Sequence, residues 1–352
     1  GDGGDPCAAP WEIGHRTIVY EDSSRGRSIP TEIYYPATAA GEDVEVACSG
    51  HERFPLLVFG HGRMGPWDIY ESLWEALVPS GYIVAFPTTE MSASPDHMAF
   101  ATDMAFVARR IREEGADPEE LFYDKVAPRS AVMGHSMGGA VSFKAAAMAP
   151  DAFAAQVSFS AGRVASGPAS TDAAVRELEA PALVFGGSDD CMTPLADYAE
   201  DYYANLGSTH KTLAVLLGAS HCQYAAEDPN CEAGRDALCP DAPEPSMSRE
   251  VQQAEAGQLA QAWLDHVLKG DPTARIAFEE LIDREELLEH TSTQYGLSPS
   301  CPDGYAPVPA NPGLGVDAAF CVSKYEMKIQ GEDDGDREYD ERFVAEARPD
   351  GT

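Results

Sequence analysis

The chain alternates between short apolar runs and longer segments whose apolar residues recur every three or four positions. Eight apolar runs have the length of strands: residues 17–21, 31–35, 56–59, 82–87, 131–134, 156–160, 183–186 and 213–217. Five segments have helical spacing or composition: residues 68–80, 95–114, 140–149, 194–205 and 249–269. Strands that alternate with helices predict a mostly parallel, eight-stranded sheet with helices on both faces.

The segment around Ser136 is the most informative part of this pattern. An apolar strand runs directly into Gly134-His-Ser-Met-Gly138, and an alanine-rich helix follows. A Gly-x-Ser-x-Gly sequence between a strand and a helix is typical of a nucleophile elbow, where a tight turn exposes the serine hydroxyl. We therefore expect Ser136 to be a nucleophile; the alternative is an ordinary glycine-rich turn.

A serine nucleophile needs a base and an orienting carboxylate, and both follow later strands. An Asp189-Asp190 pair comes after strand 183–186, and His221 comes after strand 213–217, so the order is acid and then histidine. In an open α/β sheet such strand-end loops hold the reactive groups. His61 and His135 are rival bases, but each adjoins a glycine turn and is expected to be structural.

Four motifs resemble one branch of a known superfamily: Arg27-Ser-Ile-Pro-Thr-Glu-Ile-Tyr-Tyr-Pro36, Gly60-His-Gly62, Gly134-His-Ser-Met-Gly-Gly139 and Ser220-His-Cys-Gln223. The branch contains cutinase-like polyester hydrolases, platelet-activating-factor acetylhydrolases and dienelactone-hydrolase-type esterases. The resemblance implies an α/β-hydrolase domain over residues 16–290 that cleaves carboxylic esters through an acyl-enzyme. A dienelactone hydrolase proper uses cysteine, so Ser136 argues against that activity.

The resemblance also assigns further roles. Many α/β-hydrolases have a proline four residues after the triad acid, and Pro194 lies four residues after Asp190. The resemblance therefore implies that Asp190 is the acid and that Asp189 is a neighbour without a catalytic role. The oxyanion donors are expected to be the backbone N–H of Met137, after the nucleophile, and that of Arg63, in the His-Gly-x turn. No metal ion or organic cofactor is expected.

The surroundings of the site suggest how substrate enters. Residues 161–181 are too few for the large lid that many lipases carry, so an open cleft for small soluble esters or accessible polyester chains is expected. Trp67 and Tyr70 follow the oxyanion turn and are candidates for a stacking wall. The alternative is that both rings pack at the start of a helix.

Eight cysteines and no Cys-x-x-Cys pair favour disulfides over a zinc or redox motif. Cys191 follows the proposed acid and Cys222 follows the proposed base, which must touch, so a Cys191–Cys222 bond is predicted. The other pairs are expected to be sequential: Cys7–Cys48, Cys231–Cys239 and Cys301–Cys321. Disulfides in this number indicate an oxidising compartment; the alternative is eight free thiols in a cytosolic enzyme.

Charge and the chain ends bear on partners and location. The net charge of −35 disfavours binding to nucleic acid or anionic membranes, and no apolar run is long enough to span a membrane. Residues 1–15 read as a linker that follows a removed signal or lipoprotein segment, so we expect a secreted protein. The oligomeric state is not encoded in any motif, and a monomer is the working expectation.

The composition changes near Ser298. Residues 291–352 resemble the opening of a formylglycine-generating-enzyme-like (sulfatase-modifying) domain, but this stretch is too short to complete that domain's core, and no activity is carried over. Two other functions stay open at this point. One is a peptidase of the prolyl-oligopeptidase type, and the other is a surface binding protein on a hydrolase scaffold.

Overall fold

The computed structural model describes residues 9–48, 53–284, 287–293, 305–308 and 320–323. Residues 1–293 form one compact unit and residues 294–352 form another. In the second unit the described residues are β11 (Tyr305–Val308) and β12 (Phe320–Ser323), which pair antiparallel. The predicted sulfatase-modifying resemblance therefore lies mostly outside the described residues.

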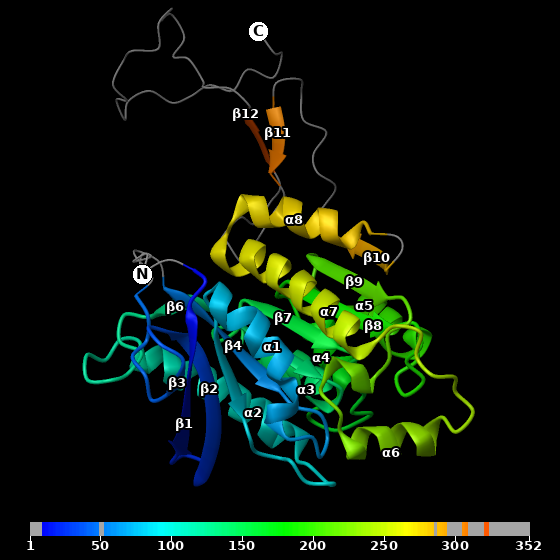
Figure 1. The fold of residues 1–352 in the computed structure, drawn as a ribbon, viewed down its shortest axis with the longest axis horizontal. Coiled ribbons are helices and arrows are strands. Elements are labelled where there is room, and N and C mark those ends of the chain that lie inside the picture. Colours follow the sequence, from blue (N-terminus) through cyan, green and yellow to red (C-terminus); the bar gives the residue numbers. More distant parts are fainter. Residues whose placement is uncertain (1–8, 49–52, 285–286, 294–304, 309–319, 324–352) are drawn as a thin grey trace, which may run out of the picture. The chain divides into compact units, whose positions relative to one another are not determined.

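The first unit is built on a ten-stranded sheet with the order β10-β9-β8-β7-β6-β4-β5-β2-β1-β3 (Figure 1). The strands from β4 to β9 are parallel, whereas β2 pairs antiparallel with β1 and β5, and β10 pairs antiparallel with β9. The short β3 pairs parallel with β1. Their bounds are β1 (Glu12–Asp22), β2 (Arg27–Ala37), β3 (Gly41–Glu42), β4 (Phe54–Gly60), β5 (Ile83–Pro87), β6 (Val126–His135), β7 (Ala155–Phe159), β8 (Ala182–Gly187), β9 (Lys211–Leu216) and β10 (Leu288–Thr293).

All eight predicted strands are present, and β3 and β10 are additional. β3 has only two residues, and β10 reads Leu-Glu-His-Thr-Ser-Thr at the edge of the sheet, so neither has the apolar run of a buried strand. In β4 and β5 every residue is buried, as expected of parallel strands covered on both faces.

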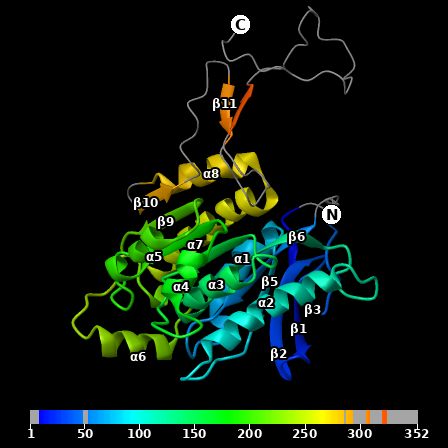
Figure 2. The ribbon, with the colours of Figure 1, turned by 180° about the vertical axis from the view of Figure 1, so that it is seen from behind.

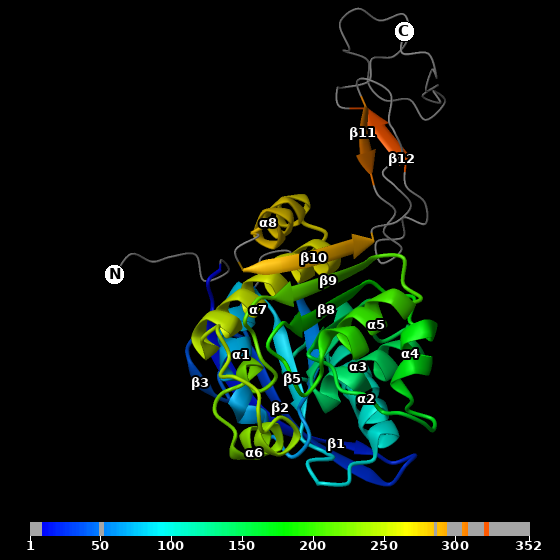
Figure 3. The same ribbon diagram turned by 90° about the vertical axis from the view of Figure 1, so that its right-hand side faces the viewer.

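Helices cover both faces of this sheet. Figure 3 shows α1 and α7 on one side and α2, α3, α4 and α5 on the other, and Figure 2 shows the second group from its outer side. The bounds are α1 (Glu71–Leu77), α2 (His97–Glu114), α3 (Met137–Met148), α4 (Thr171–Glu177), α5 (Ala199–Asn205), α6 (Pro229–Leu238), α7 (Arg249–Leu264) and α8 (Pro272–Ile282). Short turns of helix are η1 (Trp67–Tyr70), η2 (Val78–Ser80), η3 (Leu195–Asp197), η4 (Cys222–Tyr224) and η5 (Asp265–Lys269). This is the α/β-hydrolase fold.

Some predicted helix boundaries need correction. The predicted helix 68–80 is divided among η1, α1 and η2. The helix expected from residue 95 begins at His97, because the Asp96 carboxylate accepts hydrogen bonds from the free N–H groups of Met98 and Ala99. Helices α4, α6 and α8 were not predicted.

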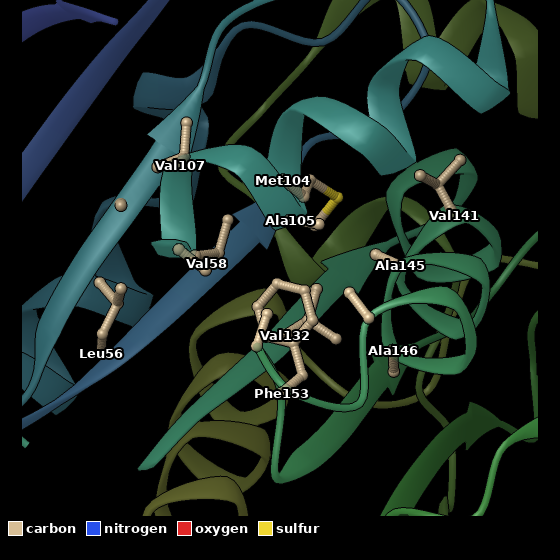
Figure 4. Close-up of a cluster of buried hydrophobic side chains, with 14 of the residues drawn as sticks. Leu56, Val58, Met104, Ala105, Val107, Val132, Val141, Ala145, Ala146 and Phe153 are labelled. Carbon is tan, nitrogen blue, oxygen red and sulfur yellow. The ribbon is translucent and has the colours of Figure 1, made fainter. Parts of the chain in front are cut away.

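The sheet supports the site through a tightly packed core (Figure 4). Val58 of β4 and Val132 of β6 are fully buried against Met104 of α2 and Val141 of α3. Burial of each such side chain contributes roughly 1.5–3 kcal/mol, so the strand ends start from a rigid base. Between β7 and β8 the only helix is α4, of seven residues, so no large lid is inserted in this described segment.

Candidate active site

Ser136 lies in a strained turn between β6 and α3. Its backbone has φ 55° and ψ −116°, a conformation that non-glycine residues rarely adopt. A Cβ on Gly134 would lie 2.4 Å from Gly138, and one on Gly138 would lie 1.9 Å from the Gly60 carbonyl oxygen. Both glycines are therefore required by close backbone packing, and the serine side chain is held at the end of β6.

His221 joins Ser136 to Asp190. Its Nε2 lies 2.8 Å from Ser136 Oγ, and its Nδ1 lies 3.0 Å from Asp190 Oδ2. Asp190 follows β8 and His221 follows β9, and each residue is 4% exposed. The structure thus brings the three residues together in one hydrogen-bonded series at the carboxyl ends of β6, β8 and β9.

The Asp190 carboxylate is held in place by four donors. Its Oδ1 accepts from the backbone N–H groups of Met192 and Thr193, both at 2.9 Å, and its Oδ2 accepts from the Thr193 hydroxyl at 2.5 Å as well as from His221. Burial alone would raise the pKa of this carboxyl group. The nearby His221 ring and these hydrogen bonds outweigh burial and lower the pKa below its ordinary value, so Asp190 is ionised.

The alternative acid, Asp189, and the alternative base, His61, form hydrogen bonds with other groups. Asp189 accepts hydrogen bonds from the N–H and hydroxyl of Ser246, at 2.9 and 2.7 Å, and makes none to His221, whose Nδ1 bonds to Asp190. Both ring nitrogens of His61 lie 2.8 Å from backbone carbonyl oxygens, those of Gly62 and Thr89. Neither residue is therefore placed to act on Ser136.

His135 is buried behind the serine and takes part in a second hydrogen-bonded chain. Its Nε2 lies 2.9 Å from the His221 carbonyl oxygen, and its Nδ1 lies 3.0 Å from Tyr70 Oη. The same Tyr70 oxygen accepts from the Gly62 N–H at 2.9 Å. Burial lowers the pKa of His135 to about 3, so its ring is neutral at ordinary pH.

A cleft of about 530 Å³ opens beside Ser136 and His221. Arg63 and Met137 both line it. Met137 is the first residue of α3, so its N–H has no acceptor within the helix. Among the described residues, neither this N–H nor that of Arg63 donates to another group. Both amides are thus available to a ligand in the cleft.

The predicted aromatic wall is not present. Trp67 does not line the cleft, because its ring packs against Tyr34 and Trp74, at 5.8 and 5.7 Å between ring centroids. Tyr70 does line the cleft, but it is 1% exposed and its hydroxyl is engaged below the surface. The packing alternative therefore describes both rings better than the stacking prediction.

The disulfide prediction near the site is wrong. Cys191 bonds to Cys239 and Cys222 bonds to Cys231, in place of the expected Cys191–Cys222 and Cys231–Cys239 pairs. The side chains of Asp190 and His221 meet, but the cysteines that follow them both reach α6 and its C-terminal end. The predicted Cys7–Cys48 and Cys301–Cys321 bonds lie outside the described residues.

These two disulfides attach α6 to the cleft. Asn230, Gly234 and Leu238 of this helix line the cleft, and Leu238 is 69% exposed. None of the ten residues of α6, all of them described, is buried. The sequence contained a signal for the helix that was missed, because Asp228-Pro229 is a capping residue followed by proline at the first helical position.

Arg163 forms part of another wall of the cleft. Its guanidinium lies over the rings of Tyr198 and Tyr202, at 5.6 and 5.0 Å from the ring centroids, and forms ion pairs with Asp172 and Asp201. These contacts hold the loop after β7 against α4 and α5. In the described part of the chain, no group of three or more His, Cys, Asp or Glu side chains is placed to hold a metal ion.

Comparisons with known proteins find two partial relatives and one matching family model. The chain is 35% identical over 94 residues to a bis(hydroxyethyl) terephthalate hydrolase of Streptomyces coelicolor, which covers 26% of this chain and 28% of the relative. It is 32% identical over 96 residues to cutinase est1 of Thermobifida alba, which covers 27% and 30%. The chain thus spans about three tenths of the length of these curated relatives. Residues 66–238, which include Ser136, Asp190 and His221, match the model of the PET hydrolase-like family.

Proposed function

We propose that this protein is a serine carboxylic-ester hydrolase whose catalytic triad is Ser136, His221 and Asp190. The observation that carries the proposal is the continuous hydrogen-bonded chain from Ser136 Oγ through both nitrogens of His221 to Asp190 Oδ2, beside a cleft. The family match over residues 66–238 and the two hydrolase relatives support an ester as substrate.

The first half of the reaction forms an acyl-enzyme. His221 Nε2 removes the hydroxyl proton as Ser136 Oγ attacks the ester carbonyl carbon. Asp190 accepts the Nδ1–H of His221, which fixes the reactive tautomer and stabilises the imidazolium. The imidazolium then donates its proton to the leaving alcohol, and the ester bond breaks. In the second half, His221 activates water, which attacks the acyl-enzyme and releases the acid.

The negative oxygen of the tetrahedral intermediate needs hydrogen-bond donors. The backbone N–H groups of Met137 and Arg63 line the cleft and have no other acceptor in the described chain. We assign them to the oxyanion hole. Donors fixed by a helix start and a tight loop do not have to reorganise during the reaction, and each such donor is typically worth about 10²–10³-fold in kcat.

The proposed substrates are small soluble esters and accessible polyester chains. One relative is named for the hydrolysis of bis(hydroxyethyl) terephthalate and the other is named a cutinase, so both an aromatic diester and a polyester belong in the test set. We further infer that the protein is secreted, because two disulfides flank the proposed acid and base. No described helix is long and apolar enough to cross a bilayer.

The test compares wild type with Ser136→Ala on p-nitrophenyl esters of increasing chain length, bis(hydroxyethyl) terephthalate, a polyester film and a peptide anilide. The expected result is ester turnover that falls on the order of 10⁶-fold in kcat in Ser136→Ala, because the nucleophile is gone. A fluorophosphonate should label Ser136 in wild type and should not label the variant.

Ser166→Ala is the matched control, because Ser166 is an exposed serine after β7 that does not line the cleft. It should keep wild-type rates. Anilide cleavage without ester cleavage would favour a peptidase. The absence of both turnover and labelling would favour a binding protein.

A further inference from the structure

The second hydrogen-bonded chain behind Ser136 connects three loops that the proposed reaction uses. At one end Gly62 precedes Arg63, whose N–H is a proposed oxyanion donor. In the middle His135 precedes the nucleophile, Ser136. At the other end the hydrogen bonds reach the backbone carbonyl of the base, His221. Tyr70 bridges the first two loops. We propose, on the basis of the proposed function, that Tyr70 and His135 are positioning residues that align the oxyanion loop, the nucleophile and the base.

Only one arrangement of protons satisfies every member of this chain. The His221 carbonyl oxygen can only accept, so His135 Nε2 carries the proton and donates to it at 2.9 Å. Because the buried ring is neutral, its Nδ1 is then an acceptor, and the Tyr70 hydroxyl donates to it at 3.0 Å. The Tyr70 oxygen is left to accept the Gly62 N–H at 2.9 Å. All donors in the chain therefore point in the same sense, from Gly62 to His221.

The residues of this second hydrogen-bonded chain are buried, which keeps its hydrogen bonds in place. Tyr70 is 1% exposed and His135 is 4% exposed, so water cannot easily replace a lost partner. The loop is also closely packed, since a Cβ on Gly62 would lie 3.2 Å from Tyr70 Oη and 3.5 Å from His135 Nδ1. A shift of Gly62 would move the adjoining Arg63 N–H relative to Ser136.

The positioning role predicts a particular kinetic signature. The Arg63 N–H is needed most when charge develops on the substrate oxygen, so misplacement weakens the transition state more than the bound ester. A residue that only maintained the fold would instead reduce the fraction of active molecules. The two roles are therefore separable if turnover is expressed per active site.

The experiment uses the full chain with Tyr70→Phe, which removes the hydroxyl and keeps the ring. Active sites are counted by burst titration with a fluorophosphonate, and kcat, KM and the Ki of a trifluoromethyl ketone are measured with a short p-nitrophenyl ester. We expect kcat per titrated site to fall about 10- to 100-fold with KM within about threefold, and Ki to weaken by the same factor as kcat/KM.

Tyr224→Phe is the matched control. Tyr224 is also buried and its ring lies 5.8 Å from the His135 ring, but it does not bond to Gly62 or to His135. It should leave kcat per site within about threefold of wild type, as expected when no reacting group is misplaced. His135→Gln, alone and combined with Tyr70→Phe, completes the test, because the effects of two residues in one chain should be less than additive.

The outcomes are distinct. A Tyr70→Phe enzyme whose kcat per titrated site and Ki match wild type overturns the inference, and so does a loss confined to the number of titrated sites. Fully additive effects of Tyr70→Phe and His135→Gln also overturn it. If wild type neither hydrolyses esters nor takes the fluorophosphonate, the proposed function itself is wrong and this inference falls with it.

Discussion

The adjacent carboxylates of Asp189 and Asp190 show how hydrogen bonds at the residue scale decide chemical roles. Oδ1 of Asp190 is fixed by two backbone N–H groups, those of Met192 and Thr193, so only Oδ2 faces His221. Asp189 is bonded to Ser246 instead. The sequence predicts that both aspartates lie in the loop after one strand. Which of them bonds to His221 depends on the direction of each side chain, and the order of residues does not determine that direction.

Asp190→Asn should lower kcat about 10⁴-fold with little change in the fold. The backbone N–H groups of Met192 and Thr193 will hold the new amide oxygen at the Oδ1 position, so the NH₂ group will face His221. A donor there forces the tautomer with the proton on Nε2, which cannot accept the proton of Ser136. The rate of fluorophosphonate labelling should fall in parallel with kcat.

Asp189→Asn is the control for this prediction, because it makes the same chemical change one residue away. Its kcat should stay within about threefold of wild type, because the Asp189 carboxylate accepts hydrogen bonds from Ser246 and Ser188 and makes none to His221. Equal losses in the two variants, or a larger loss in Asp189→Asn, would show that the acid has been assigned to the wrong residue.

At the scale of elements, the sequence pattern was informative where burial alone determines structure. Strands such as β4 and β5 are covered on both faces, so they read as continuous apolar runs and were predicted. The edge strand β10 reads Leu-Glu-His-Thr-Ser-Thr, and helix α6 buries none of its side chains, so neither has such a run. The direction of the Trp67 ring and the cysteine pairs depend on contacts between distant segments, which periodicity does not encode.

Helix α6 should depend on its disulfides to remain a wall of the cleft. Because none of its side chains is buried, packing holds it weakly, and Cys222–Cys231 and Cys191–Cys239 anchor it near both ends. In the chain-entropy model, bonds that close loops of 9 and 48 residues contribute about 2.5 and about 4 kcal/mol, respectively. After mild reduction, hydrogen exchange should increase in residues 229–238 and stay slow in α3.

The kinetic consequence should depend on the size of the ester. Gly234 and Leu238 line the cleft, so reduction should raise KM for esters long enough to contact them. It should leave kcat for an acetate ester within about threefold, because no sulfur atom belongs to the proposed triad. The double variant Cys191→Ser/Cys239→Ser separates the two bonds. Protection of α6 that survives the loss of both disulfides would show that other contacts hold the helix.

At the scale of the whole molecule, buried ionisable groups link stability to pH in opposite directions. Burial lowers the pKa of His135 to about 3 and that of His210 to about 4, so between these values and about 6.5 the unfolded chain binds protons that the folded chain does not. Their contribution to stability is complete above pH 6.5 and is lost as the pH falls. Glu114 acts oppositely, because burial raises its pKa to about 7. Its folded state binds a proton from about pH 7 down to its unfolded pKa, so it gains stability as the pH falls.

Glu114→Gln should therefore stabilise the protein at pH 8 and lose that advantage as the pH falls. Glu114 is 6% exposed and lies 3.3 Å from the Tyr20 hydroxyl, a contact that a glutamine oxygen can keep. Above pH 7 the wild-type carboxylate is charged in a buried site, which the neutral amide avoids. Urea unfolding with the disulfides intact should show the stability difference shrinking by about 1 kcal/mol per pH unit between pH 7 and 5, after allowance for solvent screening. A difference that stays constant over this range would mean that Glu114 titrates in the folded protein as it does in the unfolded chain.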